Sequence, residues 1–153
     1  MKRWGICLGV LTVLLLLPSG HRTDVGKLEP AELLYIYEED GAVMAATDTG
    51  NLGIARDLSG AMRNIKESAA GVVFLDTVDY VLVTEETKEL LGQLERDLRP
   101  GTKVILTTGP VALENLGRFL HVHNPELRLC DYLAGQKNLP KLMLAGERCF
   151  LVQ

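Results

Sequence analysis

Three short strings in this 153-residue chain combine residue types that can do chemistry. Asp48-Thr49-Gly50 places a carboxylate in a turn-forming sequence, and Asp76 and Asp79 form a closely spaced carboxylate pair. Thr107-Thr108-Gly109 offers hydroxyl and backbone N–H groups. Paired carboxylates bind metal ions or transfer protons, whereas a turn that leads into a helix receives anions on its N–H groups. Each string also has a purely structural interpretation.

The Asp48 string is similar to the catalytic triplet of aspartic proteases. In those enzymes two aspartates share one proton and activate a water molecule, so a chain with one triplet would work as a homodimer. Asn51 follows the triplet where a Ser or Ala is usual. The structural interpretation is a turn that closes a strand, because Asp and Gly favour turn geometry. A small homodimeric aspartic protease using Asp48 is therefore one alternative function.

The carboxylates of Asp76 and Asp79 flank Thr77 near a break between two apolar runs. No further metal ligand stands nearby in the sequence, so this string favours a polar turn. His121 and His123 lie two positions apart at the expected end of a helix. Asp or Cys ligands at a suitable spacing are missing there. We therefore expect no metal site.

The Thr107 string lies between an expected strand and an expected helix whose first turn contains Pro110. Backbone N–H groups at such a helix start bind anions. The string lacks the glycine spacing and the lysine of a phosphate-binding loop. Ordinary helix capping also explains it. Binding of an anion or another small ligand is thus a second alternative function, and we expect no cofactor.

Apolar runs predict the strands that would carry these strings. Strands are expected at 33–37, 43–47, 72–75, 79–83, 103–107, 127–130, 141–145 and 149–152. Asp40-Gly41 is typical of a hairpin turn. The last two strands are expected to form a second hairpin about Gly146. The Gly, Asn and Asp residues of 48–53 predict a loop, and 25–30 a short lead-in.

Three segments have apolar residues at helical spacing: Leu58 to Ala69, Leu90 to Leu98 and Ala112 to Leu120. Thr84 is the expected N-cap of the second helix, and Pro110 suits the first turn of the third. Strands and helices alternate from 72 to 120, which is typical of a buried and partly parallel sheet. The sequence therefore predicts an α/β fold: one compact domain over 21–153, with a mixed sheet and about three helices.

The first twenty residues have the features of a targeting segment. Lys2 and Arg3 are followed by an uncharged stretch, Ile6 to Leu17, of 12 residues. A helix needs about 20 apolar residues to span a bilayer, so this stretch favours a signal peptide over a transmembrane span. An uncleaved N-terminal anchor stays open. His21 stands where a lipoprotein would have Cys, so classical lipidation is not expected.

Composition and charge favour a globular protein that does not bind nucleic acid. The chain is 47% hydrophobic and 24% charged, which is ordinary for a globular protein. It carries 16 basic against 20 acidic residues, a net charge of -4, and this argues against a nucleic-acid partner. Cys130 and Cys149 each lie in an apolar run. Two free thiols and a disulfide bond both stay open.

One succession of segments has a counterpart in a known family. Arg56 to Ile65 has a helical pattern, Phe74 to Val83 ends in a Val-Leu-Val strand, and Thr84-Glu85-Glu86 leads into a Glu-bearing helix. Leu139 to Gly146 and Cys149 to Val152 have the pattern of a closing hairpin. This succession resembles the N-terminal domain of the Ger(x)C family, the C subunits of bacterial spore germinant receptors.

The resemblance implies a relative of that domain, located outside the cytoplasmic membrane, that acts by contact with other proteins. It transfers no catalytic residues because the family is not enzymatic. We therefore expect an exported, non-enzymatic protein-binding module, associated with a spore or cell-envelope assembly such as a germinant receptor. Its partner would be a protein at the membrane or envelope. Loops 48–53 and 76–79 are the expected contact regions, and the oligomeric state stays open.

Overall fold

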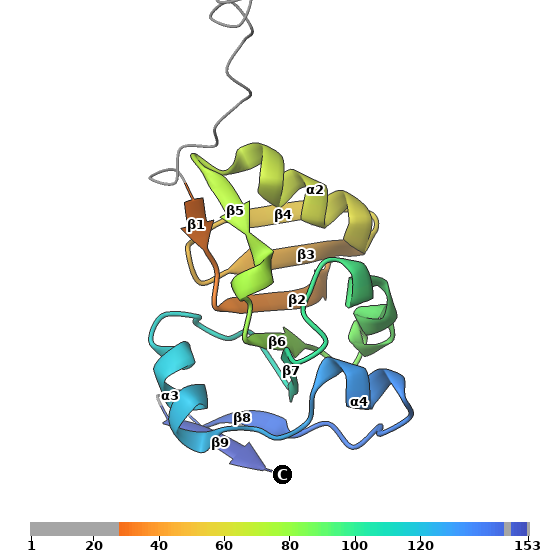
Figure 1. Ribbon diagram of the computed structural model, residues 1–153, viewed down its shortest axis with the longest axis vertical. Helices are drawn as coiled ribbons and strands as arrows, with labels where there is room; N and C mark the ends of the chain where they lie inside the picture. The colour runs from red at the N-terminus through yellow and green to blue at the C-terminus, as the bar shows by residue number, and fades with distance from the viewer. Residues whose placement is uncertain (1–27, 146–147, 153) are drawn as a thin grey trace, which may run out of the picture.

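Seven strands form one mixed sheet in the computed structural model, which describes residues 28–145 and 148–152. Across the sheet the strands are β4 (Leu52–Ala55), β3 (Ala42–Thr47), β2 (Leu33–Glu39), β6 (Tyr80–Val83), β7 (Lys103–Thr107), β8 (Lys141–Ala145) and β9 (Arg148–Val152). A separate parallel pair, β1 (Leu28–Pro30) and β5 (Val72–Phe74), lies beside this sheet (Figure 1). The expected signal segment, 1–20, lies outside the described residues.

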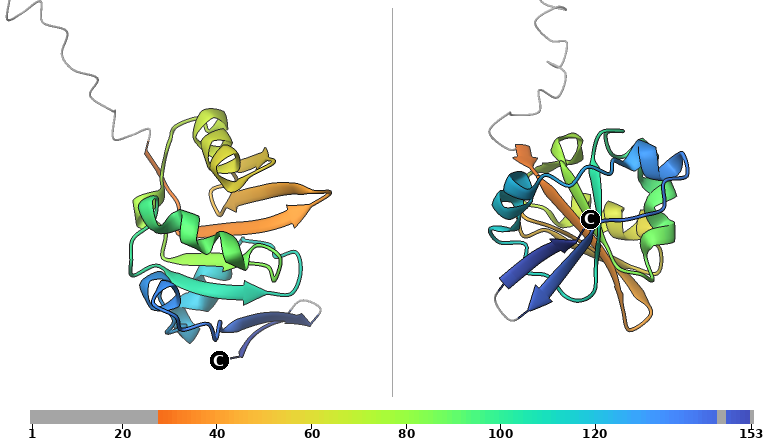
Figure 2. Two further views of the ribbon diagram at one scale, coloured as in Figure 1. Left: turned by 90° about the vertical axis from the view of Figure 1, so that its right-hand side faces the viewer. Right: turned by 90° about the horizontal axis from the view of Figure 1, so that it is seen from below.

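The four central strands β2, β6, β7 and β8 run parallel, and a hairpin is added at each end of the sheet. At one end β3 and β4 continue antiparallel from β2, and at the other end β9 returns antiparallel along β8. The arrowheads that mark the carboxyl ends of the parallel strands therefore point toward the same edge of the sheet (Figure 2). The predicted α/β fold with a mixed, partly parallel sheet is confirmed.

Helices cover both faces of the sheet. On one face lie α2 (Leu58–Ser68), the 3-10 helix η3 (Lys88–Arg96) and the short α4 (Leu129–Leu133), while α3 (Leu116–His123) lies on the other (Figure 2, right). A one-turn 3-10 helix, η2 (Leu75–Thr77), links β5 to β6. The alternation of side chains along each strand sends successive residues to opposite faces. Each face thus acquires its own apolar core.

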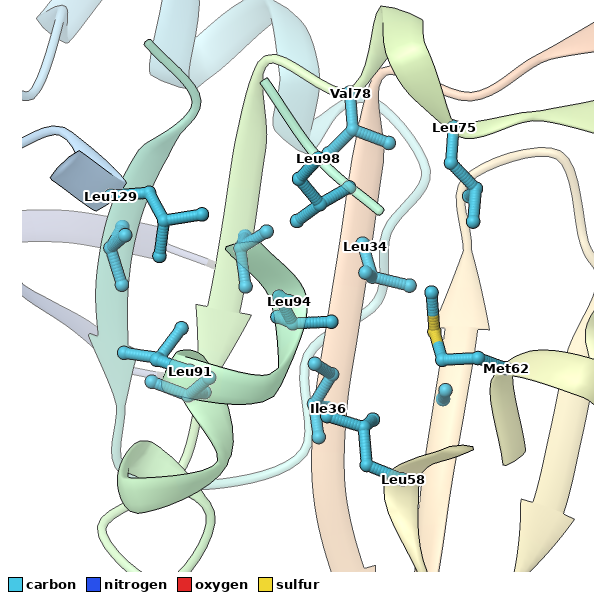
Figure 3. Close-up of a cluster of buried hydrophobic side chains, with 14 of the residues drawn as sticks. Leu34, Ile36, Leu58, Met62, Leu75, Val78, Leu91, Leu94, Leu98 and Leu129 are labelled. Atoms are coloured by element: carbon cyan, nitrogen blue, oxygen red, sulfur yellow. The ribbon is translucent and has the colours of Figure 1, made fainter. Parts of the chain in front are cut away.

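The larger core lies under α2, η3 and α4. It joins strand residues Leu34 and Ile36 to helix residues Met62, Leu91 and Leu94, all of them buried (Figure 3). The smaller core, under α3, contains buried leucines and two buried tyrosines from β2 and β6. The strands are packed on both faces by these two cores, so the loops at the two edges of the sheet start from fixed positions.

The first hairpin forms where the sequence predicts it. Asp40 and Gly41, between β2 and β3, have φ values of 52° and 74°. Two consecutive positive φ angles characterise the turn that matches the twist of a tight hairpin. Asp and Gly tolerate this left-handed conformation, so the predicted turn is confirmed.

One strand assignment and one loop boundary predicted from the sequence are wrong. Residues 127–130 make a single bridge, between Arg128 and Lys103, and then enter α4. The reason is that Leu129 and Tyr132 are both buried, which is a helical rather than an alternating spacing. The expected loop 48–53 also ends earlier than predicted, because its last residues form the edge strand β4.

Two helices begin later than the sequence predicts. The chain makes a turn at Thr84, whose carbonyl accepts hydrogen bonds from the N–H groups of Thr87 and Lys88, before η3 begins. The Thr84 hydroxyl contacts the Thr87 hydroxyl at 3.2 Å. In the third expected helix, Asn115 has φ 64°, a left-handed conformation that interrupts the helical run expected from Pro110. The helix α3 therefore starts at Leu116.

Candidate functional site

The Asp48 turn lies at the amino ends of the parallel strands, where it fastens the start of β2. One carboxylate oxygen, Asp48 Oδ1, accepts hydrogen bonds from the backbone N–H groups of Glu32 and Leu33 at 3.1 and 3.2 Å. Gly50 has φ 86°, a left-handed conformation that favours glycine. The carboxylate thus closes a turn and anchors a strand, which is the structural role that the sequence leaves open beside catalysis.

Asp76 and Asp79 lie at the same edge of the sheet, before β6. Asp79 Oδ1 accepts a hydrogen bond from Arg99 Nη2 at 2.7 Å, in an ion pair whose two side chains are about half exposed. Exposed pairs of this kind contribute little to stability. Asp76 is exposed in η2. The backbone N–H of Asp79 donates to the carbonyl of Glu32, whose own N–H contacts Asp48. The Asp48 string and the Asp76–Asp79 segment are therefore both hydrogen-bonded to the main chain of Glu32.

Thr107, Thr108 and Gly109 lie at the opposite edge, where β2, β6 and β7 end. They line a cavity of about 690 Å³, which we call the strand-end cavity. Its other walls come mainly from Tyr35, Tyr37, Glu38 and Glu39 on β2, from 84–86 after β6, from Pro110, Val111 and Leu113 after β7, and from Lys141 at the start of β8. Ligands of open α/β sheets bind at the carboxyl ends of the strands. The cavity occupies that position.

Two tyrosines form an aromatic wall of the strand-end cavity. The rings of Tyr35 and Tyr37, two positions apart on β2, are stacked with centroids 4.6 Å apart. The Tyr35 hydroxyl donates to the carbonyl of Gly109 at 3.1 Å, and the Thr107 hydroxyl donates to the same carbonyl at 3.0 Å. Burial raises the pKa of Tyr35 to about 12, with smaller effects of Tyr37 and Glu86. Tyr35 is therefore a neutral hydrogen-bond donor at physiological pH.

The charges around the strand-end cavity are mostly negative. Four glutamates line it, two at the end of β2 (Glu38 and Glu39) and two after β6 (Glu85 and Glu86), against the one ammonium group of Lys141 in the lining. Glu85 is ion-paired with Lys88, which leaves three acidic side chains against Lys141. Hydrogen bonds from its own backbone N–H and from a neighbouring threonine hydroxyl hold the pKa of Glu86 below its usual value. The Glu86 carboxylate is therefore ionised at neutral pH, and the excess of acidic over basic side chains in the lining favours cations over anions.

The structure separates the residues that the sequence singles out. The Asp48 turn and the Asp76–Asp79 segment lie at the amino edge, whereas the Thr107 string lies at the carboxyl edge. Sequence reasoning missed the tyrosines and glutamates of the strand-end cavity. The sequence does carry a signal for these side chains: they stand where two apolar runs end, at Tyr37 and at Thr84. That signal becomes informative only when the two strands are known to be parallel and adjacent, because ligands bind at the ends of such strands.

A second surface stands out at the end of the sheet. The hairpin of β8 and β9 exposes Met143, Leu144, Phe150 and Val152, which are 47%, 39%, 50% and 49% accessible. Met143 and Phe150 are paired across the hairpin, so they lie on one face of it. In the described residues β8 pairs with β7 at two positions, ending at Leu142. The rest of the β8–β9 hairpin therefore extends past the last residue at which β8 pairs with β7.

The described residues carry few other reactive groups. Cys130 and Cys149 are both free, half-buried thiols. Within the described ranges, 28–145 and 148–152, no group of three His, Cys, Asp or Glu side chains is arranged to hold a metal ion. Among the helices of those ranges, none has the length and apolar character to cross a membrane.

A scan of protein-family models and searches of curated proteins and of solved structures found no match.

Proposed function

We propose that this chain is an exported, non-enzymatic protein-binding module that docks onto a partner protein of the membrane or cell envelope through its β8–β9 hairpin. The observation that carries the proposal is the set of exposed apolar side chains on this hairpin. Exposed apolar residues that stand singly are ordinary, but a contiguous group marks an interaction site. Met143, Phe150 and Val152 share one face of this short hairpin and form a group of this kind.

The position of the hairpin supports the same function. The strand β9 stands last in the order of the sheet, so one of its edges is unpaired within the described residues. Unpaired N–H and C=O groups on an edge strand accept a strand from another protein, and the flanking side chains then supply the specificity. Phe150 and Val152 alternate along β9 and point to one face. They are suited to pack against an apolar strand or sheet of the partner.

The sequence supplies the expected location and the kind of assembly. Lys2 and Arg3 followed by Ile6 to Leu17 favour export. The resemblance to the Ger(x)C family includes the closing hairpin, Leu139 to Gly146 with Cys149 to Val152. An assembly related to a spore germinant receptor is therefore the partner that we propose.

The test uses two matched variants of the full chain, each produced with an affinity tag in its own cells. Phe150→Glu places a charge on the hairpin, and Val122→Glu places the same charge on α3 at a side chain that is 75% exposed. Membranes from growing and sporulating cells are extracted with a non-ionic detergent, and co-purified proteins are identified by mass spectrometry. We expect the unchanged chain and V122E to retain a germinant-receptor subunit and F150E to lose at least about tenfold of it, equivalent to about 1.4 kcal/mol of binding.

Circular dichroism of the purified variants is the folding control. Equal retention of the receptor subunit by F150E and V122E contradicts docking through the hairpin. Absence of any envelope protein from all three samples contradicts the protein-binding function itself.

A further inference from the structure

The strand-end cavity has the position and the size of a small-molecule site. Three adjacent parallel strands, β2, β6 and β7, end around it. The loops that follow parallel strands converge at this edge, which is why open α/β sheets bind ligands there. Ligand pockets have volumes of about 300–1,000 Å³, and the cavity of about 690 Å³ falls in this range.

The walls of the cavity combine an aromatic side with polar groups. Tyr35 is buried and its hydroxyl is held by the carbonyl of Gly109, so its ring is fixed. Tyr37 stacks on it and is itself half-buried. Val111 and Leu113 add apolar surface from the segment after β7. A ligand with a compact apolar body would therefore find a rigid, preformed surface.

The sign of the ligand's charge follows from the remaining walls. Four glutamate side chains line the cavity against one lysine, Lys141. Glu85 is paired with Lys88 beside the cavity, so Glu38, Glu39 and Glu86 supply the excess negative charge. Glu86 is close enough to Tyr35 to raise the pKa of that phenol. Aromatic rings also attract cations over their faces. Carboxylates and stacked tyrosines on the same cavity thus favour a positively charged group and oppose an anion.

The arrangement of the carboxylates and the size of the cavity decide between a metal ion and an organic cation. No three of the acidic side chains in the described part of the chain are arranged as metal ligands. A metal ion would leave most of the cavity empty, whereas an organic cation would fill it with its apolar body. We propose that the strand-end cavity binds a small organic cation, an ammonium group on a compact apolar body. This inference goes beyond the proposed docking function and involves a different surface.

The test compares three probes that share one body and differ in charge: benzylammonium, benzyl alcohol and benzoate. Each is titrated into the isotopically labelled full chain in non-ionic detergent, and amide chemical shifts are followed by NMR. We expect saturable shifts at the cavity segments, 35–39, 84–86 and 107–111, with benzylammonium binding at least about tenfold tighter than benzoate. Equal binding of benzylammonium and benzoate, or no saturable shift at these segments, overturns the proposal.

Variants locate the binding within the cavity. Glu86→Gln and Tyr37→Leu should each weaken benzylammonium binding by at least about fivefold, whereas Lys141→Gln should strengthen it because a like charge is removed. Glu89→Gln is the matched control, since Glu89 is an exposed glutamate of η3 outside the cavity lining. Unchanged affinity in both E86Q and Y37L, or an equal loss in E89Q, contradicts the assignment.

Discussion

At the scale of single residues, the carboxylate of Asp48 has a defined structural task. It accepts the backbone N–H groups of Glu32 and Leu33 where the chain enters β2. Those two N–H groups lose their acceptor when the carboxylate is removed, and an unsatisfied buried or half-buried donor lowers stability. The turn that the sequence predicts at Asp48 is therefore present. The partner of its carboxylate is 15 residues away, and no local pattern indicates it.

We expect Asp48→Ala to lower the free energy of unfolding by about 1–3 kcal/mol, because two hydrogen bonds to a charged acceptor are lost. Asp48→Asn should cost less, since its amide oxygen still accepts. Asp76→Ala, at an exposed carboxylate of η2, is the control and should stay within about 0.5 kcal/mol of the unchanged chain. Denaturant unfolding measures all three. Peptide hydrolysis that disappears in D48N without a change in folding would instead support the protease alternative.

Gly53 marks the closest approach of β4 and α2. A Cβ atom at this position would lie 2.0 Å from the backbone oxygen of Ala61 and 2.9 Å from the backbone nitrogen of Ile65. Both are main-chain atoms, so a rotamer change does not relieve the clash. We expect Gly53→Ala to destabilise the fold by about 1–3 kcal/mol or more, as overpacking does.

Thermal unfolding compares G53A with Gly101→Ala. A Cβ atom at Gly101 meets nothing within 4 Å. A melting temperature of G53A that equals that of G101A would contradict the close packing of α2 on β4.

At the scale of elements, α4 begins at an ion pair that spans its first turn. Arg128, the N-cap residue, donates from Nε and Nη2 to the two carboxylate oxygens of Asp131, at 2.7 and 3.0 Å. The hydrogen bonds from Arg128 hold the pKa of Asp131 below its usual value of 3.8, and they raise the pKa of Arg128. A depressed carboxylate pKa adds stability above the unfolded-state value, and this stability is lost as the pH falls through the folded value.

We therefore expect the Asp131 carboxyl to titrate with a midpoint below 3.8 in the folded chain. Carboxyl chemical shifts followed by NMR measure it. Arg128→Gln should move the midpoint upward, because the charged donor is removed. A midpoint at or above 3.8 in the unchanged chain would contradict the pairing at the start of α4.

The elements themselves are largely predictable from the sequence, and the errors have physical causes. The strand at 103–107 is confirmed residue for residue, because four consecutive apolar or β-branched residues, 104–107, stand between turns. The start of η3 was wrong because Thr87 is buried and bonds the distant carbonyl of Ile36 at 2.9 Å, so a tertiary contact decides the turn. The assignment of 127–130 as a strand failed because so short an apolar run suits both elements.

At the scale of the whole molecule, pairing of strands that are distant in the sequence creates the strand-end cavity. Tyr37, Glu86 and Thr108 meet in one cavity because β2, β6 and β7 are adjacent and parallel. The alternation of strands and helices predicts a parallel sheet, but it does not give the order of the strands. The sequence therefore indicates the Thr107 string of this site but not the tyrosines and glutamates that other strands bring to it. The closing hairpin, a local feature, was predicted correctly.

The measurement that tests the central claim most directly is site-specific photo-crosslinking in the protein's own cells. A photoreactive phenylalanine analogue replaces Phe150 on the edge strand β9, and in parallel chains it replaces Leu52 on β4, the opposite edge strand, or Val122 on α3. We expect a discrete adduct with an envelope protein from position 150 and none from positions 52 and 122. An adduct from position 52 or 122 with none from position 150, or no adduct beyond two copies of this chain, would contradict docking through the hairpin.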